Sequence, residues 1–415
     1  MKKKIITTLL AGTMALSLCA CGNTASNTNA NLDFSKGGNI KVWAPDATVD
    51  LTNQQIAKFL EANPSYSAYT FTVEAVGEGD AASSMITDVE GGADIFNFAQ
   101  DQIARLVSAG ALSQVAGDYA TFVKTSNDAG AAGAATVGDT VYAFPLTSDN
   151  GCFLYYDKSV ISDPSTLEGI LADCEAAGKD FYMEINSAWY QTAFFFGAGC
   201  ELTYTTDNDG NFTGVNCTYN SDNGVKALKA MAKLAESSAF QNGSSLGSAT
   251  NPAAIVDGTW DSASAQELFG ANYACAKLPT FTVDGSTYQM GGFGGFKLLG
   301  VKPQTDAAKA VVCLDLAKYL SGYDVQMDRF STVGWGPSNL EARKSEAVQA
   351  DEALSALAQQ LAFTIPQGQY PGEYWNRGTA LGDDIIAGNI NSGMSDADLL
   401  AALQSFADDC ASYAQ

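Results

Sequence analysis

The stretch Tyr69-Thr-Phe-Thr-Val-Glu-Ala-Val76 alternates polar and apolar residues, which is the pattern of a β-strand. A strand is also predicted before it, at Ile40-Lys-Val-Trp43, and another after it, at Asp94-Ile-Phe-Asn-Phe98. Between these strands, residues 52–62 and 81–89 are predicted to form helices. This β-α-β-α-β alternation predicts an α/β fold of mostly parallel sheets with helices on their faces.

The rest of the chain continues the alternation and ends in a mainly helical third. Cys152-Phe-Leu-Tyr-Tyr156 predicts another strand, and residues 201–216 predict a hairpin. Cys200 and Cys217 flank this hairpin, and the sequence leaves open whether they form a disulfide. Helices are expected over residues 164–177, 223–238, 307–321, 347–364, 379–388 and 395–414, with Ser395 as the N-cap of the last one.

The N-terminus has the features of a secretory signal that ends at a cysteine. Lys2-Lys-Lys4 precedes an apolar run, Ile5 to Leu18, which is too short to span a bilayer as a helix. The small residues before Cys21 resemble a bacterial lipobox, so we expect cleavage after residue 20 and a lipid on Cys21. Residues 21–37 are then a flexible tether at the extracellular face of the cell membrane. An ordinary signal with an incidental cysteine is the alternative.

Composition excludes several classes of function. Loss of residues 1–20, with three lysines and no acids, moves the formal charge from −24 to −27, which disfavours a nucleic-acid partner. The chain has no histidine, so it cannot assemble a Ser-His-Asp triad. It has no CxxC pair, which argues against a zinc ribbon or a redox motif. We therefore expect no catalytic residues, no metal and no cofactor in a monomeric protein.

Five segments, in order along nearly all of the mature chain, resemble the maltose-binding protein group, the extracellular solute-binding proteins of sugar transporters. The segments are Asn39-Ile-Lys-Val-Trp43, Glu90-Gly-Gly-Ala-Asp-Ile-Phe-Asn-Phe-Ala-Gln-Asp101, Tyr142-Ala-Phe-Pro-Leu146 with Phe153-Leu-Tyr-Tyr-Asp-Lys158, Ala253-Ala-Ile-Val-Asp-Gly-Thr-Trp260, and Leu278-Pro-Thr-Phe281 with Gly291-Gly-Phe-Gly294. The resemblance implies two α/β lobes joined by a multi-strand hinge, each with a mostly parallel sheet. The implied lobes are 38–148 plus 291–333 and 149–290 plus 334–415.

The same resemblance implies a receptor that captures malto-oligosaccharides between its lobes and delivers them to the permease subunits of an ABC transporter. Aromatic rings cover the apolar face of a sugar, and carboxylates bind its hydroxyl groups. The implied ligand-binding residues at matching positions are Asp46, Asp80, Phe98, Asp101, Asp149, Trp189, Trp260, Tyr374, Trp375 and Arg377. Asp46 and Asp101 each follow a predicted strand, which places them at the strand ends where open α/β sheets bind ligands.

The chain departs from the family pattern at several polar positions, and the sequence permits other functions. The chain has Glu78 and Gln102 where the family pattern has basic residues, and Ser187 where it has a glutamate, which leaves the preferred glucan open. The tryptophans have core packing as their alternative role, and Trp43 and Trp335 are expected in or near the core. Alternative functions are the same receptor fold for another oligosaccharide or a polyol, and an extracellular carbohydrate-active enzyme with two carboxylates.

Overall fold

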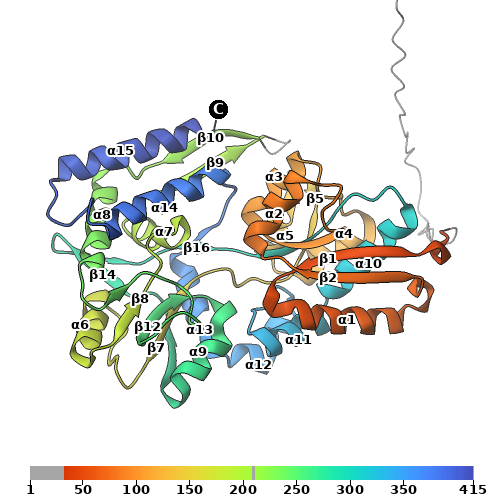
Figure 1. The fold of residues 1–415 in the computed structure, drawn as a ribbon, viewed down its shortest axis with the longest axis horizontal. Coiled ribbons are helices and arrows are strands. Elements are labelled where there is room, and N and C mark those ends of the chain that lie inside the picture. Colours follow the sequence, from red (N-terminus) through yellow and green to blue (C-terminus); the bar gives the residue numbers. More distant parts are fainter. Residues whose placement is uncertain (1–31, 208–210, 415) are drawn as a thin grey trace, which may run out of the picture. The chain divides into compact units, whose positions relative to one another are not determined.

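The computed structural model describes residues 32–207 and 211–414, and the chain from Phe34 onward forms one compact unit (Figure 1). The expected signal peptide, the lipidation site Cys21 and most of the expected tether lie outside the described residues. In the described part of the chain, no helix is long and apolar enough to cross a membrane.

The first sheet has five strands in the order β2-β1-β3-β17-β6. The strands are β1 (Gly38–Ala44), β2 (Tyr69–Ala75), β3 (Ile95–Ala99), β6 (Ala143–Pro145) and β17 (Lys297–Val301). The helices that surround this sheet are α1 (Val49–Ala62), α2 (Glu78–Thr87), α3 (Ile103–Ser108), α4 (Gly117–Ser126), α5 (Ala129–Ala134), α10 (Ala307–Leu320) and α11 (Tyr323–Val333). One apolar core contains the side chains of this sheet and its helices.

The second sheet also has five strands, in the order β11-β8-β12-β7-β13. The strands are β7 (Phe153–Asp157), β8 (Asp180–Tyr182), β11 (Phe240–Gln241), β12 (Pro252–Asp257) and β13 (Tyr273–Ala276). Its helices are α6 (Leu167–Ala177), α7 (Ala188–Gly197), α8 (Asp222–Ala235), α9 (Ser262–Phe269), α13 (Glu352–Gln360), α14 (Gly372–Ile386) and α15 (Asp396–Ser412). Leu154 packs into one apolar core and its neighbours Phe153 and Tyr155 into another, so both faces of β7 are covered.

Short paired strands and one short helix complete the described strands and α-helices. They are the hairpins β4 (Thr136–Val137) with β5 (Thr140–Val141), β9 (Leu202–Thr206) with β10 (Phe212–Cys217) and β14 (Thr280–Val283) with β15 (Ser286–Gln289), the parallel pair β16 (Phe293–Gly294) and β18 (Ile365–Pro366), and α12 (Glu346–Gln349). The hairpin predicted over 201–216 is thus confirmed, and both Cys200 and Cys217 are free thiols.

The two-lobed α/β architecture is confirmed, but the sheets are mixed rather than mostly parallel. In each sheet two strand pairings are parallel and two are antiparallel. β17 is antiparallel to both of its neighbours. The chain passes from β13 of the second sheet through β14, β15 and β16 to β17, with no helix between them. A strand that joins a sheet parallel to its neighbour usually needs a helical crossover before it.

Two helix predictions were wrong in their bounds. The helix expected over 347–364 is divided into α12, α13 and a short 3₁₀ turn, because the Asp351 side chain accepts a hydrogen bond from the Leu354 backbone N–H and starts a new helix. The helix expected over 379–388 already begins at Gly372, directly after Pro371.

Candidate functional site

The parallel strands of the first sheet end at one edge, and three predicted carboxylates follow those ends. Asp46 follows β1 in the 3₁₀ turn η3 (Asp46–Thr48), and Asp80 lies in the first turn of α2, which follows β2. Asp101 follows β3 in the turn η5 (Gln100–Gln102). Asp46 and Asp80 are exposed, whereas Asp101 is 2% exposed. This edge is the place where α/β sheets bind ligands.

The buried carboxyl group of Asp101 titrates near neutrality. Burial raises the pKa of Asp101 to about 7, while a hydrogen bond from Gln102 and the charge of Arg105 oppose this shift. Gln102 Nε2 donates to Asp101 Oδ2, and Arg105 Nη1 donates to Gln102 Oε1 at 2.7 Å. Loss of this proton near pH 7 changes Asp101 from a group with one O–H donor to a group that only accepts hydrogen bonds.

We expect Asp101 to make the protein less stable as the pH rises from about 4 to about 7. An unfolded Asp has a pKa near 3.9, so the folded protein binds the proton more tightly, and this advantage is lost on deprotonation. Urea unfolding at pH 4.5 and pH 7.5 should show the wild type losing a few kcal/mol relative to Asp101→Asn. An unchanged difference between the two proteins would mean that Asp101 does not titrate in this range.

Two predicted aromatic residues form a pair at the edge of the second sheet. Trp260 lies in the 3₁₀ turn η6 (Thr259–Asp261), just after β12, and Trp189 lies in the first turn of α7. Their ring centroids are 6.0 Å apart in an edge-to-face arrangement, and both residues are partly exposed. A side chain at Gly258 would come within 2.1 Å of the Trp260 ring, so glycine is needed for the indole to lie against the backbone.

Asp149 joins the segments that cross between the sheets. It follows β6 and is 1% exposed. Its Oδ2 accepts hydrogen bonds from Thr259 Oγ1 and from the Gly336 backbone N–H, each at 2.5 Å. Burial lowers the pKa of Arg329 to about 10, and the charge of Asp149 opposes that shift. The carboxylate is therefore bound to the residue next to Trp260 and charge-coupled to a buried guanidinium.

A buried lysine lies between the aromatic pair and a third tryptophan. Lys297 Nζ is 5.2 Å from the ring centroid of Trp260 and 3.7 Å from that of Trp335. The same nitrogen is 3.4 Å from Glu78 Oε1, and the lysine side chain is 7% exposed. Because Lys297 opens β17 and Glu78 opens α2, this cluster connects the first sheet to the tryptophan after β12.

The segment after β18 also forms hydrogen bonds with residues in the helices and turns beside both sheets. Gln367 Oε1 accepts from Trp189 Nε1 at 3.0 Å, and its backbone oxygen accepts from Gln100 Nε2. Gln369 donates to the Gln100 backbone oxygen and accepts from the Ala104 backbone N–H, both at 3.0 Å. The two glutamines thereby link Trp189 to the turn that carries Asp101.

Four predicted residues lie apart from this cluster. Phe98 is 0% exposed and Tyr374 1% exposed, and each packs in the apolar core of its own sheet, so the expectation that Phe98 stacks on a ligand does not fit its position. Arg377 Nε donates to Asp409 Oδ2 at 2.6 Å, which ties α14 to α15. Trp375 packs against Tyr374, with ring centroids 4.8 Å apart.

The sequence prediction missed Lys297, Gln367 and Gln369, and noted Glu78 only as a departure. Lys297 is the single charged residue in a strand that is buried at all five positions, and this pattern was the available signal. The glutamines lie in a loop with Gly368 and Pro371, where nothing in the local pattern indicates an interaction. Their roles depend on contacts between segments far apart in the chain.

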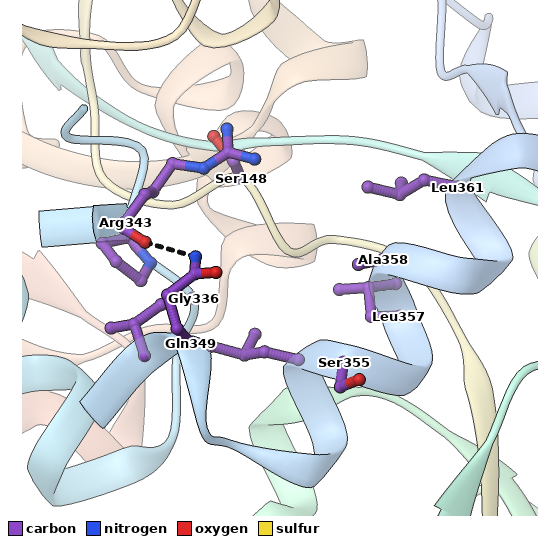
Figure 2. Close-up of a pocket in the computed structure, with 11 residues that line it drawn as sticks. Ser148, Gly336, Arg343, Gln349, Ser355, Leu357, Ala358 and Leu361 are labelled. Carbon is purple, nitrogen blue, oxygen red and sulfur yellow. Dashed lines mark hydrogen bonds between the residues drawn. The ribbon is translucent and has the colours of Figure 1, made fainter. Parts of the chain in front are cut away.

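Two neighbouring hollows are lined by other residues than the predicted ones. Figure 2 shows one of about 210 Å³, in which Arg343, Ser148 and Gly336 face Leu357, Ala358 and Leu361. A second hollow of about 460 Å³ shares Ser148, Arg343 and Leu361. Arg343 Nη1 is 3.0 Å from Asp128 Oδ2, so its charge is already paired. None of the predicted site residues lines either hollow. The candidate site is therefore the cluster of tryptophans and carboxylates, whose side chains have the chemistry that binds a sugar.

Comparisons with known proteins agree with the fold. A family model described as a bacterial extracellular solute-binding protein matches residues 54–356. A search of curated protein sequences returns no match. Among solved structures, one described as "with acarbose" is 25% identical, with a TM-score of 0.79 over 91% of this chain and 100% of that chain.

Two further solved structures share the fold. The maltodextrin-binding protein MalE1 from L. casei BL23 is 23% identical, with a TM-score of 0.74 over 90% of this chain and 99% of that chain. The maltose-maltodextrin binding protein of Alicyclobacillus acidocaldarius is 19% identical, with a TM-score of 0.71 over 88% of this chain and 100% of that chain. Both cover this chain nearly from end to end.

Proposed function

Because this chain belongs to the family of bacterial extracellular solute-binding proteins, we propose that it captures malto-oligosaccharides between its two lobes and delivers them to an ABC permease. The observation that carries the proposal is the Trp189–Trp260 pair beside the buried carboxylates Asp101 and Asp149. Flat rings suit the apolar face of a pyranose, and carboxylates suit its hydroxyl groups. The likeness to structures of maltodextrin-binding and acarbose-bound proteins supports the same class of ligand.

The proposed mechanism is closure of two lobes on the ligand. The lobes are 38–148 plus 291–333 and 149–290 plus 334–415, and Asp149 and the residues around Gly291 and Gly336 belong to the crossings between them. A ligand that contacts both lobes stabilises the closed state, which the permease then recognises. The proposed contacts are Trp189, Trp260, Asp101 and Asp149, with Asp46 and Asp80 at the margin of the site.

The direct test is a ligand panel measured by calorimetry and thermal unfolding. Saturating maltotriose should raise the melting temperature by mass action and should reduce the radius of gyration in solution scattering. A protein that responds to another oligosaccharide or a polyol, and to no α-glucan at millimolar concentration, would keep the receptor role and lose this ligand. Cleavage of the oligosaccharide during incubation would instead favour the carbohydrate-active enzyme.

The lipid anchor on Cys21 is part of the same proposal. The Cys21→Ala variant should leave the membrane fraction, or accumulate as unprocessed precursor, because the acyl chains supply the membrane affinity. Fractionation of cells that express the wild type and the variant measures this. Membrane association of the variant that still requires detergent for release would contradict the anchor.

A further inference from the structure

Six buried polar atoms in and around the tryptophan cluster have no hydrogen-bond partner among the described residues. They are Glu78 Oε1, Gln100 Oε1, Asp149 Oδ1, Asp257 Oδ2, Arg329 Nη1 and Trp335 Nε1. Buried polar groups are nearly always hydrogen-bonded, so six such atoms in one region need an explanation. Four of them are carboxyl or amide oxygens and two are N–H donors, which suits a partner that can both donate and accept.

Lys297 is at the centre of this region. Its ammonium lies 3.4 Å from Glu78 Oε1, yet this oxygen accepts no hydrogen bond in the described part of the chain. The faces of Trp260 and Trp335 lie 5.2 and 3.7 Å away. A buried ammonium with three N–H donors is normally satisfied by oxygen acceptors, and the indole rings supply none.

We propose that Glu78, Lys297 and Trp335 form a subsite for a neutral sugar ring that presents two adjacent hydroxyl groups. One hydroxyl donates to Glu78 Oε1 and accepts from Lys297 Nζ, and its neighbour accepts from Trp335 Nε1. The subsite selects a neutral ring because the paired charges of Glu78 and Lys297 leave no net charge to balance a uronic acid or an aminated sugar. This inference rests on the proposed oligosaccharide-binding function and names residues that its main platform does not include.

The first experiment measures maltotriose binding to Lys297→Met and Glu78→Gln by calorimetry. Each variant should bind at least tenfold more weakly, because a hydrogen bond to a charged group is lost. The double variant should be about as weak as either single one, because a hydroxyl shared by both residues gives non-additive losses. It also removes both charges together, which avoids an unpaired buried ion if a single variant fails to fold.

Lys302→Met is the matched control, because Lys302 is a largely buried lysine that directly follows β17 and whose partner, Asp94, lies outside this cluster. It should bind maltotriose like the wild type. A second measurement compares maltotriose with maltotriose oxidised to carboxylates at its primary hydroxyls, in the wild type and in Glu78→Gln. The oxidised form should bind at least tenfold more weakly, and Glu78→Gln should narrow this gap.

The outcomes separate the subsite from the function. A wild type that binds none of the oligosaccharides overturns the proposed function itself. A wild type that binds maltotriose while the double variant binds equally well overturns the subsite alone. Additive losses from the two single variants, or equal wild-type affinity for the oxidised form, would also overturn the shared neutral-hydroxyl contact.

Discussion

Replacement of Trp260 by alanine is expected to weaken maltotriose binding at least tenfold while the protein stays folded. Truncation of a buried aromatic anchor in a binding site costs roughly 2 kcal/mol or more, which exceeds a tenfold change in Kd. The ring is partly exposed and contacts Trp189 and Lys297 rather than the main core, so the fold should tolerate the change. Calorimetry gives the affinity, and thermal unfolding without ligand checks the fold.

Two conservative variants sharpen this experiment. Trp260→Phe keeps a flat ring and should retain most of the affinity. Trp43→Phe alters a tryptophan that packs in the first core and donates to Glu74 Oε2 at 2.8 Å, so it should lower stability without changing affinity. Wild-type affinity in a folded Trp260→Ala protein would move the binding site elsewhere. Global unfolding of Trp260→Ala would make the indole a structural residue.

Asp149→Ala is expected to lower the free energy of unfolding by roughly 3 kcal/mol. The change removes the acceptor for Thr259 Oγ1 and the Gly336 backbone N–H, both held at 2.5 Å. It also removes the carboxylate whose charge stabilises the ionised form of Arg329, which is 6% exposed. Urea or guanidinium unfolding at pH 7 measures the loss.

Asp149→Asn keeps the shape of the side chain and one carbonyl oxygen, so it should cost less than the alanine variant. Asp80→Ala, at an exposed position, should stay within about 0.5 kcal/mol of the wild type and serves as the control. An Asp149→Ala protein as stable as the wild type would mean that the crossing segments hold together without this carboxylate.

Local patterns were sufficient for the long amphipathic helices and for several strands. The strict alternation over 69–76 predicted β2, and Ser395 caps α15 as expected, with its hydroxyl accepting from the Asp398 backbone N–H at 3.2 Å. Such signals depend on residues within a few positions of each other, so one sequence is enough to read them. The break at Asp351 was also a local signal, and it was overlooked.

Burial inside an element was harder to predict than the element itself. Phe98 and Tyr374 match family positions for ligand contact, but both are core residues here. β3 is buried on both faces, and alternation does not distinguish a core face from a ligand face in such a strand. Trp189 and Trp260 are partly exposed, unlike Phe98 and Tyr374. Trp189 lies in the first turn of α7 and Trp260 just after β12, at the edge of the second sheet, where the core no longer encloses the side chains.

The sequence by itself determined the α/β class, the alternation of strands and helices over residues 40–98, and the family whose motifs the chain carries. Only the tertiary structure decided the direction of β17, the pairing of Asp149 with Thr259 and Gly336, and the position of Lys297 between two tryptophans and Glu78. The contacts of Lys297 join segments more than 30 residues apart. Their formation depends on how the sheets and crossings pack, which no short-range pattern encodes.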